Sequence, residues 1–345
     1  MAKDYFFVIR PGLNSTFQDI GRKNLYHIGL PFSGAMDKRN YLIANKLAGN
    51  EISDAVIEFA FLGPCLKYFG SKRNIVVTGN VNVKVIKKDN SKNITTSYKT
   101  IEIDNGDIID IINTNNSVYG YFTLNGGFDL NMVWGSFSTT TRALVGPNKG
   151  KKLSEGQKIF LNKTKKYSNR TLNYIDTKIE FIRVLEGTNY NYFSKDSVNN
   201  FFSKEYLVTK LTDRMGMRLE GSKLNNLKKT NIKSEGLVKG TIQVPADGNP
   251  IILLSDHGTI GGYPKLGVVI SADYDKLVQI TPGSKIKFQK IQLKDAEYLY
   301  KLYNIETNNI LNKILWIVKY KKFYQKKIRL KSFVLPLTQK ICLKF

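Results

Sequence analysis

The sequence contains only two cysteines and two histidines in 345 residues, and it has no long apolar run. Cys65 and Cys342 form no CxxC pair and lie in unrelated contexts, so neither a disulfide framework nor a zinc site is supported. With only His27 and His257 available, we predict no metal site. No stretch reaches the roughly 20 uncharged apolar residues of a membrane-spanning helix, and no signal-peptide core follows the first five residues. The sequence therefore predicts a cytoplasmic chain without a membrane span.

Acidic residues are also scarce, with 28 against 53 basic residues and a formal net charge of +25. Such a charge is typical of proteins that bind nucleic acid or an anionic surface. Only ten of the basic residues are arginine, the side chain best suited to phosphate groups and guanine edges. No platform of aromatic residues and arginine accompanies the charge. We therefore attribute the excess of lysine to a compositional bias and predict no nucleic-acid partner.

Short apolar runs bounded by glycine, asparagine, aspartate or proline dominate the sequence and predict strands. Helical patterns are few and cover residues 38–48, 194–202 and 295–302. The first of these has Asp37 as a candidate N-cap and Gly49 as a stop signal. The expected fold class is mainly β, with two β-rich domains and a few short helices.

The polar segment 162–177 has little apolar content and is the predicted linker. It separates an N-terminal domain at 1–161 from a C-terminal domain at 178–304, in line with about two domains for this length. Residues 305–345 form a basic tail with ten basic groups against one acid. Apolar residues alternate with lysines over 310–331, which permits two interpretations: a basic helix for an anionic membrane or an acidic partner, or a poorly constrained terminal extension. We favour the extension and assign it no role.

The loop at residues 256–265 concentrates a carboxylate, an imidazole, a hydroxyl, a phenol and an ammonium. Apolar runs at 250–254 and 266–270 flank it and predict buried strands that hold the loop at one end of a sheet or barrel. The pair Gly261-Gly262 removes two Cβ atoms where the backbone bends or another group approaches closely. A rigid polar loop of this kind is a typical place for binding and catalytic groups.

Two further patterns add to this candidate site. Arg214, Arg218 and Glu220 share one face of an extended segment, an arrangement that sets two guanidiniums beside one carboxylate and suits a carboxylate or phosphate ligand. His257 beside Asp256 is either a general base or a satisfied structural histidine. A serine nucleophile has little support because no GxSxG elbow is present, and no GxxxxGK[ST] or GxGxxG loop predicts nucleotide binding.

Several separated segments form a pattern along most of the chain. They are Ser15-Thr16-Phe17-Gln18-Asp19 with Gly21-Arg22, Pro31 with Ser33-Gly34-Ala35-Met36-Asp37, Ala44-Asn45, Glu58 with Gly63-Pro64, Gly126-Gly127, Gly135-Ser136 with Ser138-Thr139, Asp213-Arg214-Met215-Gly216 with Arg218-Leu219, Gly240 with Gln243-Val244-Pro245, and Thr259 with Gly261-Gly262-Tyr263-Pro264-Lys265. In this order they resemble the biotin-dependent carboxyltransferase-like family, which includes allophanate hydrolase subunit 2, KipA and the C component of 5-oxoprolinase. The resemblance covers residues 5–300 and implies an all-β architecture of cyclophilin-like barrels.

The resemblance also implies a function and partners. It implies the C component of an ATP-dependent 5-oxoprolinase, in which a KipI-like protein, the B component, is the partner and an A component joins them. ATP is then a co-substrate of a complex that converts 5-oxoproline to L-glutamate. One alternative is a KipA-like regulator that binds a KipI-like kinase inhibitor. Another is carboxyl transfer from biotin on a second chain, because this sequence has no Met-Lys-Met motif to carry biotin and no ATP-grasp signature.

Residue chemistry within the matching segments gives a predicted site. The predicted catalytic residues are His257, Lys265 and Asp256. The predicted substrate-binding residues are Arg214, Arg218, Gln243, Thr259, Gly261, Gly262 and Tyr263. Positive groups would hold a carboxylate and developing negative charge, while an imidazole or carboxyl group would move protons. We expect the loop at 256–265 to form one wall of a site that a partner chain completes.

Overall fold

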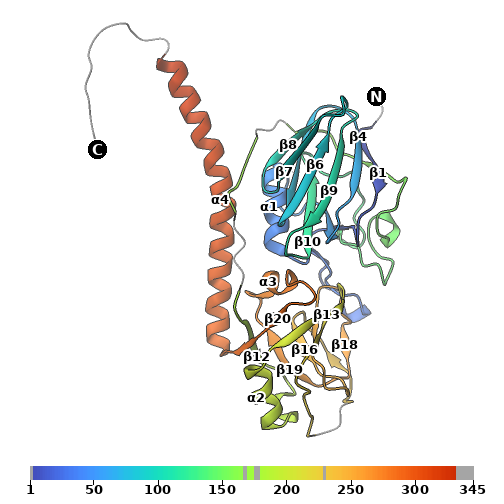
Figure 1. Ribbon diagram of the computed structural model, residues 1–345, viewed down its shortest axis with the longest axis vertical. Helices are drawn as coiled ribbons and strands as arrows, with labels where there is room; N and C mark the ends of the chain where they lie inside the picture. The colour runs from blue at the N-terminus through green and yellow to red at the C-terminus, as the bar shows by residue number, and fades with distance from the viewer. Residues whose placement is uncertain (1–2, 166–168, 175–178, 228–230, 332–345) are drawn as a thin grey trace, which may run out of the picture.

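The computed structural model describes residues 3–165, 169–174, 179–227 and 231–331, with side chains described as far as residue 314. Figure 1 shows two β-rich lobes, one above the other, and a long helix beside both. The strands within residues 5–160 build the N-terminal lobe, and those within residues 182–290 build the C-terminal lobe. None of the helices in the described part of the chain is long and apolar enough to cross a membrane.

The N-terminal lobe is built from two antiparallel sheets. One has the order β11 (Lys158–Phe160), β1 (Tyr5–Arg10), β4 (Cys65–Phe69), β9 (Ile108–Thr114), β6 (Val81–Ile86) and β7 (Lys92–Thr96). The other has the order β2 (Thr16–Gln18), β3 (Val56–Ala60), β10 (Tyr119–Leu124), β5 (Arg73–Thr78) and β8 (Thr100–Ile103). Alternate side chains of β6 are buried, as expected for a strand with one face on a core. These side chains share one apolar cluster with those of β3, β5 and β10, so the two sheets enclose a common core.

The C-terminal lobe is one eight-stranded sheet. Its order is β20 (Lys285–Ile286), β13 (Tyr206–Thr212), β14 (Gly216–Glu220), β17 (Ile251–Leu253), β16 (Thr241–Gln243), β19 (Lys265–Val269), β12 (Ile182–Glu186) and β21 (Phe288–Lys290). Only Lys287 separates the edge strands β20 and β21, so the sheet nearly closes into a barrel. A separate pair joins β15 (Glu235–Gly236) to β18 (Ile260–Gly261). The predicted mainly-β class with barrel architecture is confirmed.

Helices connect the strands at a few points. Among the described residues they are η1 (Tyr26–Ile28), α1 (Lys38–Ala48), η2 (Asn148–Gly150), η3 (Tyr190–Tyr192), α2 (Lys195–Ser203), α3 (Tyr274–Val278) and α4 (Leu293–Lys331). Helix α1 confirms its predicted signals, because the Asp37 side chain accepts a hydrogen bond from the Asn40 amide and Gly49 ends the helix in the left-handed conformation. Helix α2 begins after Ser194, whose hydroxyl accepts from the Ser197 amide.

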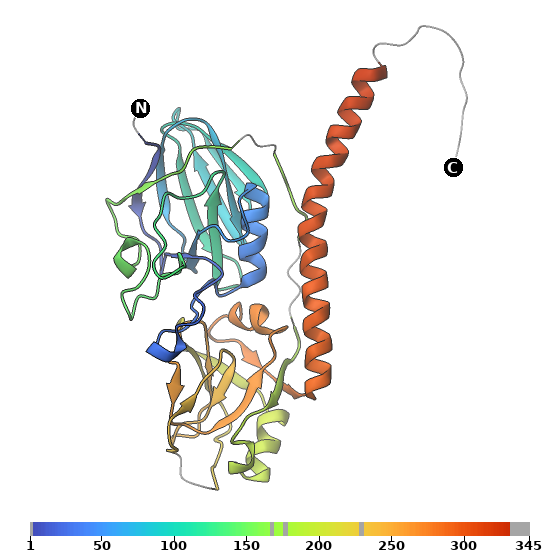
Figure 2. The same ribbon diagram turned by 180° about the vertical axis from the view of Figure 1, so that it is seen from behind.

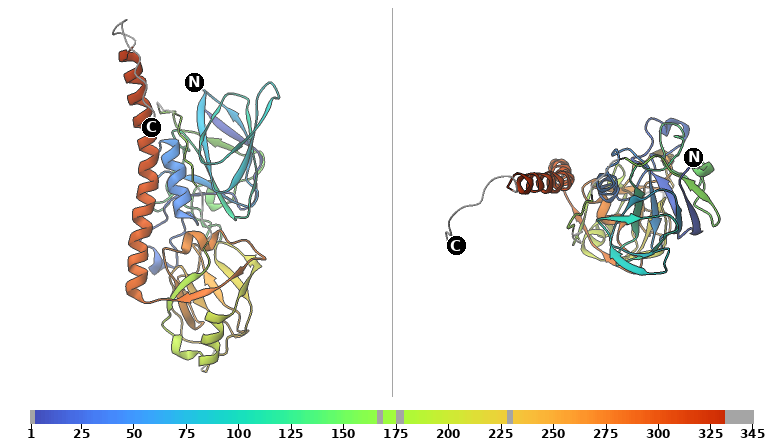
Figure 3. Two further views of the ribbon diagram at one scale, coloured as in Figure 1. Left: turned by 60° about the vertical axis from the view of Figure 1, so that its left-hand side comes forward. Right: turned by 90° about the horizontal axis from the view of Figure 1, so that it is seen from above.

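Helix α4 continues through the predicted boundary at residue 304. The sequence predicted a short helix at 295–302 followed by a tail, whereas α4 runs without interruption to Lys331. Figures 1, 2 and 3 show it alongside both lobes and next to α1. Thr307 and Ile314 are buried, and Ile314 joins an apolar cluster with Ile43 and Leu47 of α1. The preference for a poorly constrained extension at 310–331 is therefore wrong for residues 310–314, while residues 332–345 lie outside the described residues.

The predicted linker is described only in part. Within residues 169–174, the Arg170 guanidinium donates to the Lys46 carbonyl at 2.7 Å and Leu172 is buried in the cluster around α1. This stretch therefore packs along the N-terminal lobe. Residues 166–168 and 175–178 lie outside the described residues, and the domain boundaries at 161 and 178 stay predictions.

Buried polar contacts fix how the lobes meet. The Gln279 amide oxygen accepts from the Tyr119 backbone N–H at 2.8 Å, and its nitrogen donates to Asp37 at 2.9 Å. Asp275 on α3 accepts from the backbone N–H of Arg39, at the start of α1, at 3.0 Å. Because each contact joins the C-terminal lobe to β10 or α1, the cleft between the lobes has a defined width.

Candidate functional site

Arg214 joins the two lobes through two carboxylates. Its Nε donates to Asp256 Oδ2 at 2.8 Å, its Nη2 donates to Asp256 Oδ1 at 3.1 Å, and its Nη1 forms an ion pair with Glu58 on β3. Nη2 also donates to the Gly34 carbonyl at 2.7 Å. Burial acts to lower the pKa of Arg214, but Asp256 and Glu58 outweigh it and hold the pKa well above its ordinary value. The contacts with Glu58 and Gly34 therefore join the two lobes, while those with Asp256 stay within the C-terminal lobe.

A cavity of about 210 Å³ lies beside this cluster and is lined by both lobes. We call it the cationic cavity because four basic side chains line it: Arg22, Lys23, Lys38 and Lys239. Its other polar lining residues are Asp19, Tyr26, Ser33, Tyr41, Ser255 and His257. Pockets for drug-sized molecules measure about 300–1,000 Å³, so this volume suits a small metabolite.

His257 is held at the cavity by both ring nitrogens. Nδ1 lies 2.6 Å from the Gly258 carbonyl oxygen, and Nε2 lies 3.1 Å from the Tyr26 hydroxyl. Because a carbonyl only accepts, Nδ1 carries the proton, and Nε2 accepts from Tyr26. Burial lowers the pKa of His257 and raises the pKa of Tyr26. The pair is therefore a neutral imidazole and a neutral phenol, a combination suited to moving a proton.

A loop at residues 136–140 organises the acid and the arginine of the N-terminal lobe. Asp19 accepts from the hydroxyls of Ser136 and Ser138 and from the Phe137 backbone N–H at 2.7 Å, so its carboxylate is well satisfied. Arg22 donates to the Ser138 carbonyl and, at 3.2 Å, to the Thr140 hydroxyl. Its Nε has no hydrogen-bond partner among the described residues.

Lys239 reaches the cavity from the C-terminal lobe, between β15 and β16. Its Nζ lies 4.0 Å from the centroid of the Tyr274 ring, a cation–π contact. The residue as a whole is exposed, but its ammonium group lies against the Tyr274 ring at the cavity between the two lobes. Desolvation lowers the pKa of Lys239, and Lys38 and Arg214 act in the same direction against an opposing effect of Asp275.

The structure brings three of the predicted site residues together at the end of the barrel that faces the N-terminal lobe. Strand β17 ends at Leu253, and the chain then places Asp256 and His257 at this end, where the Asp256 amide donates to the Arg214 carbonyl at 2.8 Å. Arg214 and Asp256 make structural contacts, whereas His257 faces the cavity. The catalytic roles of Asp256 and His257 stay predictions.

The remaining predicted residues lie elsewhere, so the loop at 256–265 does not form one wall. Gln243 and Lys265 face each other at the far end of β16 and β19, and β19 spans about 13 Å from there to the cleft end. Lys265 is buried and pairs with Glu235 at 2.5 Å. Arg218 is exposed between buried neighbours of β14, so it does not join Arg214 on one face.

Contacts within the lobe also account for the other loop residues. A Cβ on Gly261 would lie 2.7 Å from a methyl of Leu237 and 2.9 Å from the Gln243 amide nitrogen. The backbone at Gly261 is therefore close to protein side chains. The Gln243 amide donates to the Tyr263 carbonyl at 3.4 Å. The Thr259 and Gly262 carbonyls accept backbone hydrogen bonds from Leu237 and Ile232. Their substrate-binding roles stay predictions.

Sequence reasoning missed most of the cavity. Arg22 belongs to a segment of the family pattern, and this was the one signal that could have selected it. Tyr26 has no motif around it, and Lys38 and Lys239 are not distinguished from the many other lysines. Their shared position depends on how the two lobes meet, which no local pattern encodes.

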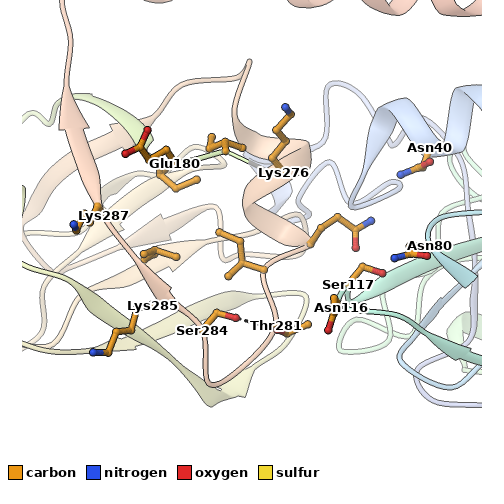
Figure 4. A pocket seen from close by; sticks show the side chains of 15 residues that line it. Asn40, Asn80, Asn116, Ser117, Glu180, Lys276, Thr281, Ser284, Lys285 and Lys287 are labelled. Atoms are coloured by element: carbon orange, nitrogen blue, oxygen red, sulfur yellow. Dashed lines mark hydrogen bonds between the residues drawn. The ribbon is translucent and has the colours of Figure 1, made fainter. Parts of the chain in front are cut away.

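A larger cavity of about 430 Å³ lies at another part of the junction and differs in chemistry. Figure 4 shows its amide side chains, Asn40, Asn80 and Asn116, on one side and Lys285 and Lys287 on the other. We call it the amide-lined cavity. Among the described residues, no histidine, arginine or tyrosine lines it, and its wall includes four isoleucines. The cationic cavity is therefore the better candidate for catalysis.

Comparison with known proteins agrees with this architecture. Residues 28–290 match the family described as carboxyltransferase domain, subdomain A and B. The chain is 32% identical over 286 residues to the 5-oxoprolinase C subunit of Haemophilus influenzae, covering 83% of this chain and 91% of that protein. It is 30% identical over 290 residues to the 5-oxoprolinase C subunit of Escherichia coli, covering 84% and 92%.

A solved structure is similar over most of the fold. The crystal structure of K. lactis urea amidolyase matches with a TM-score of 0.81 at 25% identity, over 90% of this chain and 20% of that one. The sequence pattern, the nearly closed barrel and these matches lead to one conclusion. The chain belongs to the carboxyltransferase-domain family of subdomains A and B.

Proposed function

We propose that this chain is the C component of an ATP-dependent 5-oxoprolinase and that it acts with partners of the B and A types. The two relatives named as 5-oxoprolinase C subunits support this proposal, because the alignments cover 91% and 92% of their lengths. The observation that carries it is the cationic cavity, where cations from both lobes meet a neutral imidazole–phenol pair in a space suited to a small metabolite.

The chemistry of the substrate fits these groups. 5-Oxoproline carries one carboxylate and one cyclic amide, and ATP in the complex would activate the amide oxygen by phosphorylation. Arg22, Lys38 and Lys239 can stabilise a carboxylate or negative charge on the activated oxygen. Ring opening by water also needs a base, and His257 can take a proton through Tyr26 because its Nε2 accepts from that hydroxyl.

The proposal is tested by mixing the chain with its cognate A and B proteins and following glutamate and phosphate release from 5-oxoproline and ATP. Lys239→Met should lower kcat/KM at least tenfold, and His257→Gln should lower kcat, because each removes a group that acts at the cavity. Lys287→Met is the matched control, since Lys287 lines the amide-lined cavity. If the B and C proteins form a stable complex but the complete mixture makes no glutamate, the chain is not a 5-oxoprolinase component. A KipA-like regulator is then favoured.

A further inference from the structure

We propose that the cationic cavity is a binding site for an oxyanion, a carboxylate or a phosphate group, held by Arg22, Lys38 and Lys239. This inference rests on the proposed function and narrows it, because it assigns the anionic part of the substrate to these three residues. The remaining end of the ligand then faces the pair of Tyr26 and His257.

The first observation is a charge imbalance. Four basic side chains line the cavity, but Asp19, the one carboxylate among the described lining residues, is occupied by the loop at residues 136–140. Asp256 lies nearby, yet its two oxygens accept from Arg214. In the part of the chain that the structure describes, no ion pair joins a carboxylate to Lys38 or Lys239. Asp275 acts on Lys239 without forming an ion pair with it, so positive charge at the cavity exceeds the carboxylate charge around it, and this excess favours an anionic ligand.

The second observation is an unpartnered buried donor. Arg22 is 1% exposed, and its two Nη groups donate to Ser138 and Thr140, whereas its Nε–H has no partner among the residues described. Buried donors are nearly always satisfied by protein, water or ligand. Because Arg22 lines the cavity, its guanidinium charge attracts an oxyanion bound there, although the Nε–H itself is covered by protein.

The third observation is that the site is held in place from both lobes. The loop at residues 136–140 fixes the Arg22 guanidinium, and Lys38 occupies the first turn of α1. In the C-terminal lobe, Lys239 is placed by its contact with the Tyr274 ring of the same lobe. An anion between these groups would bind to both lobes at once, so its binding should also stabilise their contact.

The chain contains two histidines, which makes a specific test possible. Inorganic phosphate is titrated into the full chain at constant ionic strength, with chloride as the balancing anion, while NMR follows both imidazoles. His257 lines the cavity and should show a saturable shift, whereas the exposed His27 should not. The thermal midpoint should rise with the same dissociation constant. Competition with acetate and with 5-oxoproline distinguishes a carboxylate site from a phosphate site.

Lysine variants show which residues bind the phosphate. Lys239→Met and Lys38→Met should each weaken phosphate binding at least tenfold; Lys239 is exposed and Lys38 half-buried, so the variants should fold. Lys285→Met, which removes a lysine from the amide-lined cavity, is the matched control and should bind as the parent does. The inference is overturned if no anion gives a saturable His257 shift, or if all three variants behave alike. Phosphate binding without glutamate formation by the complete complex would instead overturn the proposed function and leave this site standing.

Discussion

The two ends of the C-terminal barrel carry similar polar residues but use them differently. At the end facing the N-terminal lobe, Arg214 pairs with Glu58 of the other lobe and His257 lines a cavity. At the far end, Lys265 pairs with Glu235 of the same lobe and Gln243 donates to a loop carbonyl. The comparison indicates that these side chains become a candidate site only where a second lobe supplies an opposing wall.

The largest expected effect comes from Arg214→Met at the cleft end. The substitution leaves Glu58 and Asp256 buried without their shared cation, which should cost about 3–5 kcal/mol of unfolding free energy. Urea denaturation of the full chain measures it. Arg218→Met, on the exposed face of β14, is the control and should change stability by about 0.5 kcal/mol or less. Equal losses in the two variants would remove the distinction between a lobe-joining and a surface arginine.

Local signals predicted the elements of the fold well. Asp37 and Gly49 mark both ends of α1, and Ser194 marks the start of α2, because caps depend on hydrogen bonds within a few residues. The same reasoning failed at α4. Its buried positions, such as Thr307 and Ile314, are separated mainly by asparagines and one lysine, and they face another helix that is distant in sequence.

The site was predicted less completely, for a related reason. The loop at 256–265 was correctly placed between strands, but β19 must pair antiparallel with β16, and this register carries Lys265 to the opposite end from His257. Proximity in sequence therefore did not become proximity in space. Conversely, Tyr26 and His257 meet although 231 residues separate them, and only tertiary packing creates that contact.

Tyr303→Phe tests whether α4 contributes to the cleft end. The Tyr303 hydroxyl donates to Asp275, which also accepts from the start of α1, so the substitution removes one bond to a buried carboxylate. We expect a loss of about 1.5–3 kcal/mol in chemical denaturation. Tyr298→Phe changes an exposed phenol of the same helix and should be neutral. If the two variants are equally stable, α4 does not stabilise the junction through this contact.

Lys265→Met tests the end of the barrel that faces away from the N-terminal lobe. Methionine keeps most of the buried volume, and Glu235 is 44% exposed on its side chain, so water can solvate the carboxylate that loses its partner. The expected loss is about 1 kcal/mol or less. In the reconstituted complex, Lys265→Met should also lower the rate less than Lys239→Met does. If Lys265→Met lowers the rate more than Lys239→Met does, Lys265 rather than Lys239 acts in the reaction, as the sequence predicted.

The smallest effect concerns the pH dependence contributed by His257. Burial lowers its pKa below the ordinary value of 6.5, so the unfolded chain binds a proton more readily than the folded chain. The stability that follows is fully present above about pH 6.5 and is lost as the pH falls toward the folded pKa. Denaturation between pH 5 and 8 should therefore show a slope that His257→Gln reduces, and His27→Gln, at an exposed position, is measured as the comparison variant. If both variants keep the parent slope, carboxylates rather than the cavity histidine set the acid response.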